Sequence, residues 1–160
     1  MHVCTYICFV KLEEALKTDK FLSQNQKAGL NILYTAWWLK TVISSELKFL
    51  GLTHEQYNVL RILKGKHPQQ ICVKDIGSRL IEQNSNVPRI IDRLVAKKLV
   101  SRNTSILDKR ETVMTLTDSG IEILRSATNK MNAKLKTIMV ISEKDAEELN
   151  RLLERFRELE

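Results

Sequence analysis

The sequence predicts a mainly α fold of the α+β class. Apolar residues recur at helical spacing along most of the chain, and two short β-like runs interrupt them. Residues 84–117 hold, in order, an amphipathic helix, a β-like run, a polar connector and a second β-like run. This order predicts a winged helix-turn-helix, in which one helix enters the DNA major groove and a hairpin reaches the flanking backbone or minor groove.

The second observation is the distribution of charge. Residues 84–110 contain seven Lys and Arg against two Asp, a net charge of +5 in a chain whose total is +7. Such a concentration on a helix and its neighbouring turn is expected of a protein that neutralises phosphates. Charge alone would favour an ordinary solvated face, but its coincidence with the helix and hairpin pattern favours a DNA-binding surface.

Length and composition are those of an ordinary globular chain. Its 160 residues are 43% hydrophobic and 28% charged, and no apolar run approaches the roughly 20 residues that span a bilayer. The N-terminus lacks a basic leader and a cleavage site, so we expect a cytoplasmic protein without membrane association. Three cysteines without a CxxC pair predict no disulfide framework, and no metal or other cofactor is expected.

Residues 1–25 are expected to be an N-terminal extension, and residues 26–52 a dimerisation helix. The apolar residues of that helix cover more than one face, which predicts packing beyond its own domain. Trp37 and Trp38 point about 100° apart, so at least one needs a separate surface. With Tyr57 they form a candidate ligand pocket, although core packing is the commoner fate of such side chains.

The next helix has a well-defined start. Thr53 and Gln56 stand at the positions of a capping box, and Leu52 and Tyr57 at those of a hydrophobic staple. Gly65 and Pro68 are expected to end it. A short helix over residues 74–81 and the basic helix that follows complete the helix-turn-helix within residues 53–117.

Cys72 precedes the short helix, where Ser or Thr would cap it. Helix N-termini favour the reactive thiolate form, so Cys72 is a candidate redox residue. The alternative is a small buried residue at the end of a strand.

Pro88 restricts where the basic helix begins. Proline is tolerated only in the first turn, so Ser85 or Asn86 can act as the N-cap, whereas Asn84 would put Pro88 one position too deep. The strands of the wing are expected at Leu99–Arg102 and Thr112–Leu116.

Residues 118–160 are expected to form C-terminal dimerisation helices. Thr117 can cap a helix that runs to about Ile138, and Ser142 precedes the last one. That last helix carries an apolar stripe, Leu149, Leu152, Leu153 and Phe156. Seven acidic and four basic residues over 142–160 oppose the basic middle of the chain, as expected if DNA and a partner subunit meet different parts.

Residues 28–158 resemble the MarR family of bacterial transcriptional regulators. The resemblance rests on GLTHEQYNVLRIL, on VPRIIDRLVAKKLVSR and on LDKRETVMTLTDSG, in that order. It implies a homodimer formed mainly by the first and last helices, a pseudo-palindromic double-stranded DNA operator, and often release of DNA by a small-molecule or oxidant signal.

The resemblance also implies roles for individual residues. In the wing, Asp108 and Arg110 match an Asp-x-Arg pattern whose arginine enters the minor groove and whose aspartate orients it. Predicted DNA contacts are Ser85, Asn86, Arg89, Arg93, Lys97, Asp108, Lys109 and Arg110.

Two positions depart from the family pattern. Lys98 stands where glycine usually ends the recognition helix, so its side chain must tolerate or avoid a left-handed backbone. Pro88 replaces a residue that could hydrogen-bond DNA, so the operator sequence cannot be carried over.

An enzyme is the first competing class, and we expect none. The chain has five glycines and no phosphate-binding loop, HExxH, GxSxG or paired-carboxylate motif. The better alternative is a winged-helix protein-interaction module without specific DNA binding. The primary prediction is a sequence-specific DNA-binding regulator, a repressor released by a small molecule or oxidant.

Overall fold

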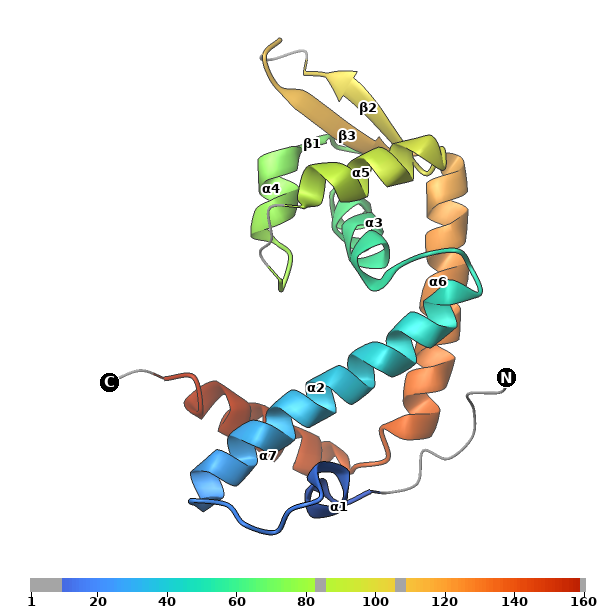
Figure 1. Ribbon diagram of the computed structural model, residues 1–160. Coiled ribbons are helices and arrows are strands. Elements are labelled where there is room, and N and C mark those ends of the chain that lie inside the picture. Colours follow the sequence, from blue (N-terminus) through green and yellow to red (C-terminus); the bar gives the residue numbers. More distant parts are fainter. Residues whose placement is uncertain (1–9, 83–85, 106–108, 159–160) are drawn as a thin grey trace. The chain divides into compact units, whose positions relative to one another are not determined.

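The computed structural model describes residues 10–82, 86–105 and 109–158 (Figure 1). The chain divides into two compact units, residues 1–45 and 46–160. In chain order the described elements are α1 (Leu12–Leu16), α2 (Gln24–Lys48), α3 (His54–Lys66), β1 (Ile71–Cys72), α4 (Val73–Ser78), α5 (Val87–Ala96), β2 (Val100–Thr104), β3 (Thr112–Leu116), α6 (Asp118–Ile138) and α7 (Glu143–Arg155). None of these helices combines the length and apolar character that crossing a bilayer requires.

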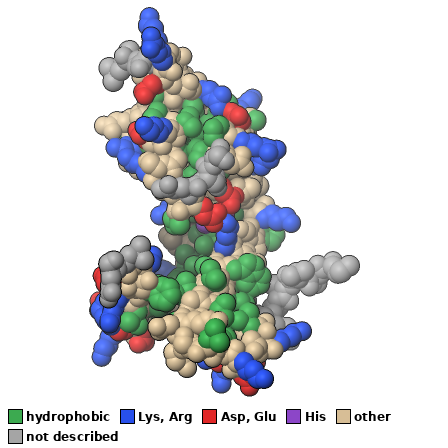
Figure 2. All heavy atoms as spheres, turned by 60° about the vertical axis from the view of Figure 1, so that its left-hand side comes forward, with side chains coloured by type: hydrophobic (Ala, Val, Ile, Leu, Met, Phe, Trp, Pro, Cys, Tyr) green, Lys and Arg blue, Asp and Glu red, His purple; other side chains and the backbone are tan. Residues whose placement is uncertain are grey.

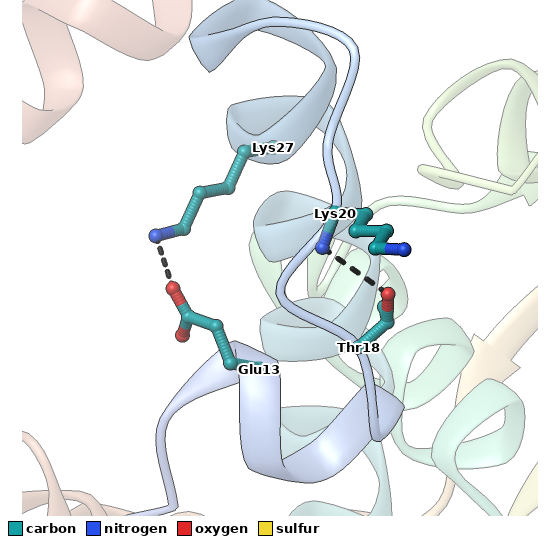
Figure 3. Close-up of polar contacts among 4 residues, drawn as sticks. All are labelled: Glu13, Thr18, Lys20 and Lys27. Carbon is teal, nitrogen blue, oxygen red and sulfur yellow. Dashed lines mark hydrogen bonds and ion pairs between the residues drawn. The ribbon is translucent and has the colours of Figure 1, made fainter.

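The first unit holds α1 and most of α2. Helix α2 begins at Gln24, two residues before the predicted start at residue 26. The hydroxyl of Ser23 accepts a hydrogen bond from the amide of Gln26 at 3.1 Å and so stabilises this earlier start. Glu13 of α1 forms an ion pair with Lys27 of α2, and the Thr18 hydroxyl accepts from the amide of Lys20 at 3.2 Å (Figure 3).

The ion pair gives the first unit a pH dependence. The hydrogen bond from Lys27 lowers the pKa of the partly exposed Glu13 carboxyl. A carboxyl whose pKa is lower in the folded than in the unfolded state stabilises the folded protein at pH values above its unfolded pKa. This contribution to stability is lost as the pH falls through the folded pKa. We expect an NMR titration of Glu13 to show a lower midpoint in the wild type than in Lys27→Met. Equal midpoints would show that the ion pair does not form in solution.

In the second unit, α3 begins with the predicted capping box. The Thr53 hydroxyl accepts from the amide of Gln56, and the Gln56 side chain accepts from the amide of Thr53, both at 3.2 Å. Gly65 lies inside the helix, which ends at Lys66. The core of this unit contains these fully buried side chains: Leu47, Val59, Leu60, Leu63, Ile76, Ile91, Leu94 and Met114. Helix α3 contacts α4, α5, α6 and β3, so it is the element around which the others pack.

The sheet is antiparallel, in the order β1–β3–β2. Strand β3 has the predicted bounds, whereas β2 begins one residue later and ends two residues later than expected. The amide of Leu99 explains the later start, because it donates to the carbonyl of Leu94 and so closes the helix. Strand β1 is only two residues long and pairs Ile71 with Met114.

The helix predicted over residues 74–81 is shorter in the structure. Helix α4 ends at Ser78, because the amides of Arg79 and Leu80 bond three residues back, to Ile76 and Gly77, and tighten the turn. Leu80 is buried, but Ile81 is 94% exposed and does not belong to the apolar face assigned to it.

The bounds of α6 and the start of α7 are confirmed. The Thr117 hydroxyl accepts from the amide of Gly120 at 3.0 Å and begins α6, which ends at Ile138. The Ser142 hydroxyl accepts from the amide of Asp145 at 3.1 Å and begins α7. No residue of α7 is buried.

Candidate nucleic-acid interface

Helix α5 separates an apolar face from a polar one. Its buried residues are Val87, Ile90, Ile91 and Leu94. Asn86, Arg89 and Arg93 are exposed. Asn86 is the N-cap, which confirms one of the two predicted starts and puts Pro88 at the second helical position, where its missing amide costs nothing. The core therefore fixes α5 from the side of α3 (Figure 1). Its cationic side chains lie on the opposite, exposed face.

The exposed arginines of α5 have no partner among the residues that the structure describes. Within the described residues, neither the Arg89 nor the Arg93 guanidinium forms a hydrogen bond or an ion pair. Two unpaired guanidiniums one helical turn apart suit bidentate recognition of a base edge or a phosphate.

The wing supplies further positive charge beside α5. The amide of Ser105 donates to the carbonyl of Glu111 at 2.9 Å and continues the β2–β3 pairing beyond Thr104 and Thr112. Lys109 and Arg110 lie at this end of the hairpin and are exposed. Lys and Arg side chains spread over the surface of the second unit, and some project from the hairpin end at the top of Figure 2. Ser85 and Asp108 were also predicted to contact DNA, and both lie outside the described residues.

Lys97 has intramolecular partners that the sequence did not indicate. Its ammonium group donates to the carbonyl of Gly51 and, at 3.0 Å, to the side chain of Gln56. Gly51 has a φ of +66° and ends α2, while Gln56 belongs to the capping box of α3. Lys97 thus joins the end of α5 to the turn between α2 and α3. Its contact with DNA stays a prediction and would require the side chain to leave both partners.

A second interaction missed by the sequence links α5 to the wing. Arg102 of β2 forms an ion pair with Asp92 of α5. Both side chains are partly exposed, at 44% and 58%. No local pattern reveals this pair, because it depends on how β2 leaves the end of α5.

Lys98 takes the left-handed backbone that glycine usually supplies. Its φ is +58°, its amide donates to Val95, and Leu99 bonds back to Leu94, which together end α5 in the manner of a Schellman motif. The Thr117 hydroxyl also donates to the carbonyl of Lys98 at 2.8 Å. The left-handed residue is therefore held from both sides at the junction of α5, β2 and α6.

Replacing Lys98 with glycine is expected to stabilise the protein by about 1 kcal/mol, because glycine adopts positive φ without a Cβ penalty. Urea unfolding at one fixed protein concentration measures this effect. Ala96→Gly is the matched control in the last turn of α5, and it is expected to destabilise by up to about 1 kcal/mol. A lower free energy of unfolding for Lys98→Gly than for the wild type would contradict backbone strain at Lys98.

The three aromatic residues of the candidate ligand pocket do not share one environment. Trp37 is 60% exposed and contacts Tyr34, with ring centroids 5.6 Å apart. Trp38 is half-buried in the same unit. Tyr57 belongs to the other unit and is buried, with its hydroxyl 3.3 Å from that of Thr128. Tyr57 therefore serves the core, and a pocket that includes all three stays a prediction.

Cys72 is the residue before α4 and also the last residue of β1, the two positions considered for it from the sequence. Its side chain is half-buried and makes no capping hydrogen bond to α4. Its redox role stays a prediction. In the described part of the chain, no group of three His, Cys, Asp or Glu side chains is placed to hold a metal ion.

Residues 52–112 match the sequence profile of the MarR family. The HTH-type transcriptional regulator MgrA of Staphylococcus aureus is 31% identical over 106 residues, which cover 66% of this chain and 70% of MgrA. The organohalide-sensing regulator RdhR, with bound 2,4-dichlorophenol, aligns with a TM-score of 0.75 at 19% identity and covers 85% of this chain and 80% of its own. A mutant of Staphylococcus aureus MepR bound to an oligodeoxyribonucleotide aligns with a TM-score of 0.56 at 23% identity. This alignment covers 80% of this chain and 94% of the MepR chain. At these identities the two structures establish the fold alone.

Proposed function

The chain belongs to the MarR family of winged helix-turn-helix transcriptional regulators, and on this premise we propose how it engages DNA. Helix α5 enters the major groove and reads base edges through Arg89, with Asn86 and Ser85 beside it. Arg93 contacts phosphate, and Arg110 places the wing in the adjacent minor groove with Lys109 and Asp108 close by. The site is a double-stranded pseudo-palindromic operator, and the protein acts as a repressor in the cytoplasm.

One observation carries this proposal. The exposed guanidiniums of Arg89 and Arg93, which have no partner in the described part of the chain, stand on the outer face of a helix whose inner face is fixed by the core. A helix held in this way presents its cations at a defined spacing, which specific readout requires and non-specific attraction does not. The solved structure of a MepR mutant bound to an oligodeoxyribonucleotide supports the proposal, because it has the same fold and is bound to DNA.

Hydroxyl-radical footprinting on the protein's own upstream region tests the proposal. We expect a discrete protected site with two halves about one helical turn apart. Protection that spreads evenly over the fragment would instead support the winged-helix protein-interaction module.

We further propose that the protein is a homodimer through its terminal helices. In the second unit, large apolar side chains remain exposed on the α6–α7 connector and along α7: Met139, Val140, Ile141, Leu149, Leu152 and Phe156. In the first unit, Leu33 and Trp37 of α2 are exposed as well. A monomer in water would not retain this much apolar surface without a partner.

A dimer at micromolar concentration is the expected result of light scattering. Leu152→Glu should shift the distribution toward monomer, because it places a charge in the apolar stripe of α7. Glu147→Gln alters the polar part of the same helix and serves as the control. A wild-type monomer at this concentration would refute the proposed homodimer.

A small-molecule effector is the proposed signal. RdhR, which has the same fold, holds 2,4-dichlorophenol, and this makes phenolic compounds the first class to titrate. An oxidant acting on Cys72 is the second candidate signal. Release of DNA by phenols in both the wild type and Cys72→Ser would assign the signal to a ligand, whereas peroxide release lost in Cys72→Ser would assign it to the thiol.

A further inference from the structure

Asp92 is the only acidic residue on the proposed DNA-reading helix. Its side chain is 58% exposed, so burial does not neutralise the carboxylate. Asp92 lies three residues after Arg89, and side chains at this spacing are neighbours on a helix surface, about 5–6 Å apart at Cβ. An Asp92 without another partner would compete with DNA for Arg89.

The structure gives Asp92 a different partner. The Arg102 guanidinium reaches it from β2, ten residues further along the chain. Arg89 is left without an ion pair among the described residues, although its sequence spacing to Asp92 is suitable. Arg102 of β2 thus pairs with the Asp92 carboxylate, which would otherwise pair with Arg89 on the same helix.

We infer that Arg102 is a positioning residue for DNA recognition: it holds the Asp92 carboxylate and so keeps Arg89 available to read a base. This inference rests on the proposed function. It assigns Arg102 an effect on sequence discrimination, although Arg102 itself touches no base. The pair is too exposed to contribute much to folding stability, since such ion pairs are worth little in water.

The substitution Arg102→Gln separates this role from simple charge loss. We expect it to lower affinity for the operator about tenfold and for shuffled DNA about threefold, so that preference for the operator falls. Lys109→Gln removes the same charge from the same hairpin without freeing a carboxylate. It should weaken binding to both DNAs by a similar factor and leave the preference unchanged.

The second substitution is a suppressor. Adding Asp92→Asn to Arg102→Gln removes the released carboxylate, and operator preference should return to near the wild-type value. Asp92→Asn alone should raise affinity for both DNAs slightly, because it frees Arg102, and should leave preference unchanged. Circular dichroism melts of each variant establish that all are folded.

Three outcomes separate the possibilities. Equal losses on both DNAs in Arg102→Gln, without specific rescue by Asp92→Asn, would overturn the inference and make Arg102 a phosphate contact. Loss of preference in Asp92→Asn alone would also overturn it, because Asp92 would then read a base itself. A wild-type protein with no operator preference would instead refute the proposed function, and the inference with it.

Discussion

Gly120→Ala is expected to destabilise the protein by roughly 3 kcal/mol or more, because backbone atoms occupy the space of the new methyl group. A Cβ at this position would lie 2.1 Å from the carbonyl oxygen of Leu99 and 3.2 Å from the Cδ2 atom of Leu116. The carbonyl cannot rotate away, since it also accepts a hydrogen bond from the amide of Thr117. The first turn of α6 would have to separate from the end of α5.

Urea unfolding followed by circular dichroism measures this effect, at one protein concentration because unfolding of a dimer depends on concentration. Gly65→Ala is the matched control. A Cβ at Gly65 meets nothing within 4 Å, and alanine favours the helix, so this variant should gain up to about 1 kcal/mol. Similar stabilities for the two variants would show that α5 and α6 do not approach as closely in solution as described.

Arg89→Ala and Arg110→Ala are expected to weaken DNA binding in different ways. Arg89→Ala should cost roughly 1–3 kcal/mol per half-site on the operator and relax discrimination at one base pair, most plausibly a G·C pair. Arg110→Ala should weaken binding to operator and random DNA alike and make the slope of log affinity against log salt shallower by about one contact per wing. The difference follows from a base contact in one case and a minor-groove contact in the other.

Binding titrations at several salt concentrations distinguish these effects. Asp108→Ala should be a milder form of Arg110→Ala, and the double mutant should be non-additive if the carboxylate orients the guanidinium. Unchanged affinity and salt slope in Arg110→Ala would mean that the wing does not touch DNA.

The features predicted correctly from the sequence are those that local chemistry determines. The capping box of Thr53 and Gln56, the caps at Thr117 and Ser142, and the bounds of β3 all follow from residues within a few positions of one another. The buried face of α5 likewise follows from helical spacing. The resemblance left open whether Lys98 tolerates or avoids a left-handed backbone, and the structure shows that Lys98 adopts one.

The features that the sequence missed depend on residues far apart in the chain. A strand that ends at Cys72 was one alternative from the sequence, but its partner β3 lies some forty residues further along the chain and no local pattern identifies it. Lys97 reaches a carbonyl 46 residues away, and nothing near it in sequence marks that partner. The burial of Tyr57 likewise depends on the packing of α3 against α6, whereas a ligand pocket with Trp37 and Trp38 stays a prediction.

The most direct test of specific DNA recognition is the ratio of two affinities measured under the same conditions. Fluorescence anisotropy would compare the footprinted upstream site with a shuffled duplex of equal length and composition, at near-physiological salt. We expect the site to bind about a thousandfold or more tightly, because specific complexes exceed non-specific ones by at least this factor. Equal affinities for the two duplexes would contradict base readout by α5 and leave the helix as a basic surface without sequence preference.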